Sequence, residues 1–480
     1  MLRQTLLYMP AQLLGPLAMF VAAVVWTHLL DAETYGIVSY VLAAQELVYT
    51  LTIAWWSLYA LRFRAAMNAE RRRMLVEADN AVVFGAALVQ AAVAFPVLRG
   101  LDGSPSPGLV LATALLFLTR SLLTHYSEIA RTEQATFTYT IAQLAGPLFG
   151  TLASYVGVVA FAATPTAAIA GIALAQALGL AFVMVRLGVK PVLHRPQRQV
   201  VREALVYGLP ILVAGGLAWV TTNGIRLAVD ALAGAEGLGL LSVGWGLGQR
   251  VSSVAAMLLT AAAFPIAVRL FESGDRAGAM RRLADNGSML FALLAPTTAG
   301  VAMVSRTLTE LMIAEPYRAV TVAILPIAVL AGSLRNQRAH FVDQAFLLHA
   351  APRRLIPLTA IEAVACLGGT LLGLIFGGGG AGSLVAATAG CTVGTFIGLA
   401  VATGVAMRDH RLRPQWGTLG RILAGTAAMC AALAAVPWGA GVVGLIGEIG
   451  AGVIVYVIAL ALLFPTERRY VIGKLRARLG

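Results

Sequence analysis

Charged side chains are scarce in this sequence. Asp, Glu, Lys and Arg together make up 12% of its 480 residues, and the mean hydropathy is +0.82. Soluble domains carry roughly 25% charged residues, so the composition excludes an ordinary soluble enzyme or binding module. No long polar stretch separates the apolar segments of about 20 residues that recur along the chain. The sequence therefore indicates an all-α integral membrane protein.

Cysteine and lysine are nearly absent. The three cysteines (Cys366, Cys391 and Cys430) lie in apolar runs, so they indicate small core residues rather than a disulfide framework. Lys190 and Lys474 are the only lysines, and the net charge of +13 is therefore almost entirely arginine. The arginines lie in short loops between apolar segments rather than on one face of a folded domain, which argues against nucleic acid as a partner.

Motifs that carry catalysis are also missing. The sequence has no GxxxxGK[ST] loop, no HExxH and no CxxC pair. The predicted outer loops are too short to build an external catalytic domain. The glycine run Gly377–Ser383 follows no strand, so we interpret it as a flexible turn rather than a phosphate-binding loop. We expect neither an enzyme nor a bound cofactor or metal.

What the sequence does contain is a series of hydrophobic segments long enough to cross a bilayer. We predict 14 membrane helices. They cover about residues 7–29, 34–60, 80–99, 108–127, 137–161, 167–186, 205–228, 237–265, 286–305, 318–345, 355–376, 384–407, 422–438 and 442–464.

Arginine and lysine concentrate in every second loop, whereas the intervening loops carry Asp and Glu and little more arginine than Arg99, Arg306 and Arg318. By the positive-inside rule this pattern predicts an even number of helices with both termini in the cytoplasm. Trp26 and Trp438 are expected near outer helix ends, and Trp55 and Trp56 near an inner end. The basic segment Thr466–Gly480 is either an amphipathic helix on the inner leaflet or a plain cytoplasmic flank.

A repeated hairpin indicates that the chain consists of two similar lobes. The stretch Leu232–Ser242 echoes Leu30–Ser39, and the alignment places Glu236 on Glu33, Gly239 on Gly36 and Ser242 on Ser39. We predict an N-terminal lobe over 1–204, a C-terminal lobe over 205–421, and two further helices with a basic tail over 422–480.

A second echo joins Ala11–Leu17 (AQLLGPL) to Ala142–Leu148 (AQLAGPL). A Gly-Pro pair inside a membrane helix weakens the backbone hydrogen-bond ladder. We expect both helices to bend there.

Five arginines fall inside predicted helices: Arg120, Arg226, Arg250, Arg335 and Arg338. Each costs about 2.5–3.5 kcal/mol near the bilayer centre, so such residues mark a candidate functional site. Arg250 lies near mid-membrane, and Arg335 and Arg338 share a helix face, whereas Arg226 is close enough to the outer end to snorkel. Arginine binds phosphate bidentately and stays charged, which suits an anionic cargo.

Acids within or beside the helices are fewer. Glu46 lies near mid-membrane and Glu362 on the inner half of its helix, while Asp343 follows the arginine pair. Each of them can form a structural ion pair with an arginine or bind a coupling proton or Na⁺, and the sequence leaves both alternatives open.

The pattern LLDAETYGIVSYVLAAQ (Leu29–Gln45), its recurrence after residue 228, and the stretch Leu308–Leu330 resemble bacterial polysaccharide flippases of the Wzx type. These belong to the multidrug/oligosaccharidyl-lipid/polysaccharide (MOP) superfamily, which also contains the MATE transporters. The resemblance covers essentially the whole chain through loose motifs. One departure is Asn223, because many relatives carry an acid beside the arginine that corresponds to Arg226.

The resemblance implies two pseudo-symmetric six-helix lobes around a central cationic cavity, with two extra C-terminal helices. It further implies a flippase in a bacterial inner membrane that moves an undecaprenyl-diphosphate-linked oligosaccharide to the periplasmic leaflet by alternating access. The expected partners are this anionic lipid-linked glycan, the bilayer, and the glycan polymerase machinery of O-antigen, capsule or exopolysaccharide synthesis. The alternatives are an ion-coupled efflux pump of the same superfamily and a non-transporting enzyme or scaffold of glycan synthesis.

Overall fold

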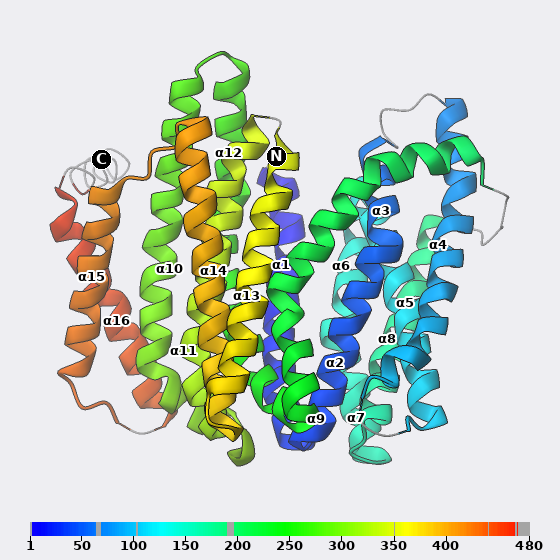
Figure 1. Ribbon diagram of the computed structural model, residues 1–480, viewed down its shortest axis with the longest axis horizontal. Coiled ribbons are helices and arrows are strands. Elements are labelled where there is room, and N and C mark those ends of the chain that lie inside the picture. The colour runs from blue at the N-terminus through cyan, green and yellow to red at the C-terminus, as the bar shows by residue number, and fades with distance from the viewer. Residues whose placement is uncertain are drawn as a thin grey trace. The chain divides into compact units, whose positions relative to one another are not determined.

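The computed structural model describes residues 2–63, 69–101, 104–189, 196–349, 351–439, 441–465 and 468 (Figure 1). Side chains are described for all of these except 2–13, 69, 72, 258, 260–265 and 352. Every regular element in these ranges is a helix. The prediction for Thr466–Gly480 falls almost wholly outside the described residues.

The helices of the first half are α1 (Leu2–Leu29), α2 (Ala32–Tyr49), η1 (Thr50–Ala54), α3 (Trp55–Phe63), α4 (Ala69–Leu98), α5 (Pro107–Thr132), α6 (Thr136–Leu144), η2 (Ala145–Gly150), α7 (Thr151–Ala160) and α8 (Pro165–Leu187). Those of the second half are α9 (Arg198–Glu272), α10 (Arg276–Met312), α11 (Glu315–Gln337), η3 (Arg338–Val342), α12 (Asp343–Leu348), η4 (Pro352–Arg354), α13 (Leu355–Phe376), α14 (Gly380–His410), α15 (Trp416–Ala434) and α16 (Val442–Leu463).

These elements confirm the 14 predicted membrane helices. Three of the predicted helices each combine two α-helices joined by a π-helical segment, namely η1, η2 or η3. Long α9 contains two predicted helices, because Gly234 breaks it with φ 69° and ψ −178°. Only glycine adopts that backbone conformation readily, so Gly234 alone forms the turn between these two helices.

The two copies of the repeated Gly-Pro motif lie in different types of helix. In the later copy, Gly146 and Pro147 lie within the π-helical segment η2, where the missing proline N–H loosens the ladder. In the earlier copy the helix stays α-helical throughout α1. The bend of these two helices, and a cavity shared between them, stay predictions.

The chain divides into two compact units, each of which is described by itself. The first contains residues 1–243 and 370–384, and the second contains residues 244–369 and 385–480. The three-part division at residues 204 and 421 stays a prediction.

In the first unit the two copies of the repeated hairpin pack directly against each other. A Cβ on Gly36 would lie 1.8 Å from the carbonyl oxygen of Ala235, and one on Gly239 would lie 1.8 Å from that of Ala32. A hydrogen bond of 2.8 Å joins the buried hydroxyls of Ser39 and Ser242. Small residues allow such close approach of helix backbones in membranes. Residues that align in the sequence thus meet as pairs where α2 crosses the second part of α9.

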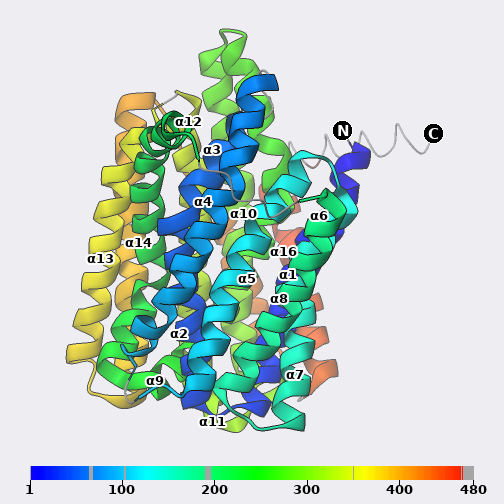
Figure 2. The same ribbon diagram turned by 90° about the vertical axis from the view of Figure 1, so that its right-hand side faces the viewer.

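The core of the first unit forms between α3, α4, α5 and α8, which lie side by side (Figure 2). Trp56 has no exposed surface and Tyr126 is 1% exposed. Trp26 is also buried. Both rings therefore pack against protein, and the interfacial depth that the sequence suggests for Trp26 and Trp56 stays a prediction.

The second unit packs α10 against α11, α15 and α16. Tyr456 on α16 donates a 2.6 Å hydrogen bond to the carbonyl of Ala292 on α10. As the apolar context predicted, Cys366 and Cys391 are buried and reduced, and Cys430 is partly buried.

Candidate functional site

The first unit gathers charged side chains from three helices in the middle of its bundle. Glu46 lies on α2, Arg120 on α5, and Asn223 and Arg226 on the first part of α9. Asn223 donates to the Glu46 carboxylate at 3.5 Å and accepts from Nη1 of Arg226 at 3.3 Å. The carboxylate also interacts electrostatically with both guanidinium groups. We call Glu46, Arg120, Asn223 and Arg226 the first-unit cluster.

The first-unit cluster carries an excess of positive charge. Two guanidinium groups face one carboxylate, so one positive charge remains uncompensated. Arg120 and Arg226 are half-buried and Glu46 is exposed, although all three lie within hydrophobic spans. Nε of Arg226 is buried without a hydrogen-bond acceptor within the described part of the chain. Guanidinium groups held in this way favour an anion, which supplies the missing acceptor.

Asn223 explains how the cluster forms without a neighbouring acid on α9. The sequence departs from the expected pattern at this position, which placed a local ion pair of Arg226 in doubt. The structure supplies the carboxylate from α2 instead, with Asn223 as the bridge. Arg226 lies eight residues before the Gly234 turn and contacts this cluster, so its guanidinium is held within the bundle.

The second unit places Arg335 beside an aromatic and an amide side chain. Nη1 of Arg335 donates a 2.7 Å hydrogen bond to Gln249, and its guanidinium lies 6.0 Å from the Trp245 ring centre. Gln249 is itself fixed by a 3.0 Å bond to the carbonyl of Ala328. Arg250 follows Gln249 on α9 and is half-buried, as is Arg335. We call Trp245, Gln249, Arg250 and Arg335 the second-unit cluster.

Arg338 has a different environment, although it lies only three residues after Arg335. Its guanidinium forms a short ion pair with Glu362 and donates to Thr359 at 3.1 Å and to Asp343 at 3.3 Å. Arg338 and Glu362 are both 3% exposed. The π-helical segment η3 begins at Arg338, and the two arginines bind different partners. The role of Arg338 as a substrate ligand stays a prediction, but contact with a substrate would require breaking a buried ion pair.

One polar network in the first unit was not predicted from the sequence. Trp56 and His125 both donate to the Asp79 carboxylate, at 2.7 and 3.1 Å, and Ser57 lies 2.7 Å from the other ring nitrogen of His125. The predicted helix began at residue 80, which left Asp79 in a loop, whereas α4 begins at Ala69. A polar residue at the edge of an apolar run gives no signal by hydropathy. His125 lay inside a predicted helix and would have provided the clue.

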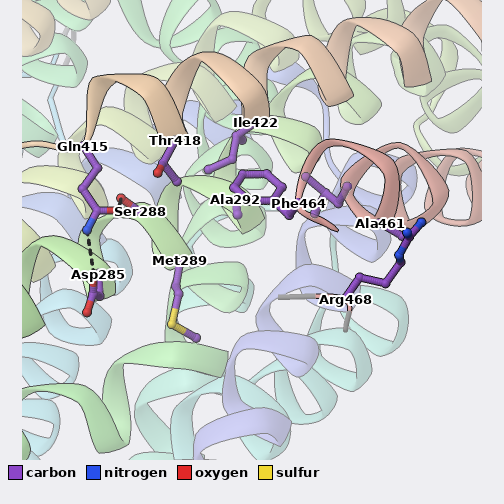
Figure 3. Close-up of a pocket in the computed structure, with 11 residues that line it drawn as sticks. Asp285, Ser288, Met289, Ala292, Gln415, Thr418, Ile422, Ala461, Phe464 and Arg468 are labelled. Atoms are coloured by element: carbon purple, nitrogen blue, oxygen red, sulfur yellow. Dashed lines mark hydrogen bonds between the residues drawn. The ribbon is translucent and has the colours of Figure 1, made fainter. Parts of the chain in front are cut away.

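A groove of about 550 Å³ lies in the second unit between α10, α15 and α16 (Figure 3). Asp285, Ser288 and Gln415 form its polar end, where Gln415 donates to Asp285 at 2.6 Å. Apolar side chains line its middle, among them Met289, Ala292, Ile422, Ala461 and Phe464, and Arg468 lies at the end opposite Asp285. None of the predicted site arginines lines this groove. Among the described residues no group of three His, Cys, Asp or Glu side chains could hold a metal ion.

The fold and the charged clusters define a class of protein. In the described part of the chain 12 helices are long and apolar enough to cross a membrane, with the two predicted helices of α9 counted as one and α1 left out as too short, and arginines lie half-buried within these spans. The protein is therefore a multi-pass membrane protein with polar sites inside its helix bundle.

Comparison with known proteins identifies the family. Residues 1–271 match the family of polysaccharide biosynthesis proteins, and the chain belongs to that family. Its fold is that of the MOP superfamily, as the sequence resemblance predicted. No curated protein sequence matches the chain.

Solved structures share this fold at low sequence identity. The lipid II flippase MurJ in an inward closed conformation is 10% identical, with a TM-score of 0.76 over 96% of this chain and 99% of that chain. An inward-facing MATE multidrug resistance transporter is 14% identical, with a TM-score of 0.59 over 83% of this chain and 96% of that one. An outward-facing MATE multidrug resistance transporter is 15% identical, with a TM-score of 0.56 over 86% of this chain and 95% of that one. At these identities the likeness shows the fold alone.

Proposed function

We propose that the protein is a flippase that moves an undecaprenyl-diphosphate-linked oligosaccharide from the cytoplasmic to the periplasmic leaflet of a bacterial inner membrane. The glycan would serve O-antigen, capsule or exopolysaccharide synthesis. The observation that carries the proposal is the excess of guanidinium over carboxylate in the first-unit cluster. Membership in the polysaccharide biosynthesis family supports the class of cargo.

Arginine in both clusters suits a diphosphate better than it suits a cation. A diphosphate loses its hydration in the bilayer, and the loss is tolerable only when charged donors replace water. Guanidinium offers planar pairs of N–H groups that bind phosphate oxygens bidentately. We assign Arg120 and Arg226 of the first-unit cluster and Arg250 and Arg335 of the second-unit cluster to cargo binding. Arg338 is assigned a positioning role through its ion pair with Glu362.

The remaining assignments follow from charge and hydropathy. The arginine-rich loops face the cytoplasm in this proposal, and both termini lie there too. The groove between α10, α15 and α16 suits an acyl or isoprenoid chain, because hydrophobic side chains line its middle and the charged residues Asp285 and Arg468 lie at its two ends. Glycan polymerase machinery is the proposed downstream partner.

The test is export of surface glycan in a strain that lacks the native protein. Arg250→Ala should abolish surface glycan while the variant accumulates normally in the membrane. Arg306→Ala is the matched control, because Arg306 is exposed and pairs with Glu310 four residues away. Leaflet-resolved labelling of the lipid-linked precursor should show it held on the cytoplasmic side. Normal glycan export by Arg250→Ala would overturn the assignment.

The structural likeness to MATE transporters favours a second candidate, an ion-coupled efflux pump for small cations. Such a pump needs acids that dominate its binding site, whereas arginine outnumbers acid in the first-unit cluster. Resistance profiles of a deletion strain separate the two functions. Sensitivity to cationic drugs with normal surface glycan would favour the pump.

A further inference from the structure

We propose that the groove between α10, α15 and α16 holds an anionic phospholipid of the predicted cytoplasmic leaflet. The lipid phosphate binds at Arg421 and Arg468, and one acyl chain occupies the apolar middle of the groove. This lipid stays bound to the protein and is not the transported cargo. The proposal goes beyond the proposed function, and its binding measurements are independent of the cargo.

The groove lies at the membrane boundary that the sequence predicts. Asp285 and Arg421 each directly precede a predicted membrane helix, and Phe464 ends another. The N–H of Arg468 donates to the carbonyl of Phe464 at 3.0 Å, so Arg468 lies one helical turn beyond that boundary. By the positive-inside rule this boundary faces the cytoplasm. The groove is therefore at the level where phospholipid headgroups and the first part of their acyl chains lie.

Two guanidinium groups lie near Phe464, which lines the groove. The guanidinium carbon of Arg421 is 5.7 Å from the centre of the Phe464 ring. Arg468 lines the groove itself, one turn after Phe464, and both arginines are exposed. Within the described ranges, no carboxylate forms an ion pair with either guanidinium. Two such cations beside an apolar groove favour a phosphate group at the membrane surface.

The opposite end of the groove has negative charge. Asp285 lies there and accepts a 2.6 Å hydrogen bond from Gln415. Ser288 in turn donates to the side-chain oxygen of Gln415 at 3.3 Å. A carboxylate repels a phosphate, so the charges at the two ends define one orientation for an anionic lipid, with its headgroup at Arg468.

The middle of the groove is apolar and is formed by helices that are bonded to one another. Its apolar lining includes Met289, Ala292, Ile422, Leu460 and Ala461. Tyr456 connects α16 to α10 through the carbonyl of Ala292, and the bond from Gln415 to Asp285 connects the start of α15 to α10. The groove is therefore present before a lipid binds, which reduces the cost of ordering the site.

The size of the groove favours an acyl chain over the isoprenoid of the proposed cargo. Its volume of about 550 Å³ is within the range of sites for small ligands. One acyl chain fits this space. An undecaprenyl chain is much longer, and it would have to extend past the carboxylate of Asp285. The groove therefore matches a membrane phospholipid better than the cargo lipid.

The first experiment measures the binding of defined lipids. Protein purified in detergent is titrated with phosphatidylglycerol, or with phosphatidylcholine that carries the same acyl chains, and bound lipid is counted by native mass spectrometry. We expect one tightly bound phosphatidylglycerol per protein and much weaker binding of phosphatidylcholine, because only phosphatidylglycerol has a net negative charge. Equal binding of the two lipids overturns the proposal.

The double variant Arg421→Ala/Arg468→Ala tests the phosphate end of the site. It should bind phosphatidylglycerol about twentyfold to thirtyfold more weakly, since each arginine near a membrane surface contributes about fivefold. Arg306→Ala is the matched control, because Arg306 is an exposed arginine of the same unit that pairs with Glu310, and it should bind as the native protein does. Size-exclusion chromatography checks that both variants fold. Unchanged binding by the folded double variant contradicts the proposal.

Photo-cross-linking locates the bound chain. Phosphatidylglycerol with a diazirine in one acyl chain should label peptides of α10, α15 and α16 that contain Met289, Ile422 and Leu460. Ala461→Phe fills part of the apolar middle, so it should reduce this labelling while both arginines remain. Labelling confined to other helices overturns the proposal. The assignment is also wrong if undecaprenyl phosphate displaces the probe from these peptides more readily than unlabelled phosphatidylglycerol does, because the groove then belongs to the isoprenoid.

Glycan flipping in proteoliposomes separates this site from the proposed function. If phosphatidylglycerol binds in the groove but the protein moves no lipid-linked glycan, the proposed function is wrong and the phospholipid site stands. If the glycan moves but the protein binds phosphatidylglycerol and phosphatidylcholine equally, the phospholipid site is wrong and the proposed function stands.

Discussion

The first-unit cluster and the ion pair of Arg338 with Glu362 contain the same kinds of charged side chain, but they differ in exposure and in charge balance. In the first-unit cluster, Arg120 and Arg226 face one exposed carboxylate, that of Glu46. In the second unit, Arg338 is enclosed by Glu362 and Asp343, with Arg338 and Glu362 3% exposed. The first-unit cluster has more arginine than carboxylate, whereas the charge of Arg338 is balanced by the carboxylates around it. An intramembrane arginine thus indicates a ligand site only when its partners leave it accessible and uncompensated.

The largest expected effect is a loss of stability when the buried ion pair of Arg338 with Glu362 is broken. Arg338→Ala leaves the Glu362 carboxylate buried without its partner, which costs about 3–5 kcal/mol in such environments. We expect loss of folded protein from the membrane, measured by fluorescence-detected size-exclusion chromatography and thermal unfolding. The double variant Arg338→Leu/Glu362→Leu should recover much of the lost stability, because it removes both charges. A stable, transport-defective Arg338→Ala protein would instead assign Arg338 to the cargo.

The next effect tests whether the helices around the open cluster move. Ser39→Cys/Ser242→Cys should form a disulfide between α2 and α9, since the two hydroxyls lie 2.8 Å apart. With the three native cysteines replaced by alanine, oxidation should stop glycan flipping and reduction should restore it. Thr298→Cys/Ser333→Cys is the matched control in the second unit, where the hydroxyls are also 2.8 Å apart. Undiminished flipping in the oxidised first pair would show that α2 and α9 stay together during transport.

Removing one guanidinium from the open cluster should affect transport rather than folding. Arg226→Ala should lower the flipping rate by about tenfold to a hundredfold, because a charge-assisted hydrogen bond contributes roughly 1.5–3 kcal/mol. Arg226→Lys should retain part of the rate, since it keeps the charge but loses the bidentate geometry. The measurement is leaflet-resolved flipping at matched protein level. If Arg226→Ala unfolds as Arg338→Ala is expected to, then Arg226 stabilises the fold in the same way as Arg338, and the contrast between the first-unit cluster and the Arg338–Glu362 ion pair is wrong.

The smallest effect is expected for Glu46→Gln. The substitution keeps the shape of the side chain and increases the positive charge around Arg120 and Arg226. If Glu46 only balances charge, flipping should change by no more than a few-fold, with tighter retention of lipid-linked diphosphate on purification. Abolished flipping would instead identify Glu46 as a coupling residue. Native mass spectrometry of co-purified lipid checks the binding and the proteoliposome assay checks the rate.

Much of the fold follows from local patterns. Each of the 14 helices was predicted from its apolar run, because a bilayer requires about 20 apolar residues per crossing. Boundaries were less certain where polar residues continue a helix beyond the apolar run, as at Ala69–Asp79 of α4. The helical hydrogen-bond ladder extends across such residues, but hydropathy does not register it.

The partners of the charged residues could not be predicted in the same way. Arg335 and Arg338 share a face of an ideal helix, yet Arg335 binds Gln249 and Arg338 binds Glu362. The Asp79–His125 pair joins residues 46 positions apart, and the Asn223–Glu46 contact joins residues 177 positions apart. Contacts of this kind depend on which helices pack together, and the spacing of residues along one helix does not specify that.

The sequence by itself determined the membrane class, the helices and the repeated hairpin, because each depends on hydropathy and spacing within a short stretch of chain. It also showed that five arginines lie inside membrane helices, where their free energy of insertion is high, and this marked them as candidate site residues. Only the tertiary structure decided which arginines are compensated, how Gly36 and Gly239 pair, and that Asp79 meets His125. The physical reason is that a buried charge takes its free energy from all the groups around it, and those groups come from distant parts of the sequence.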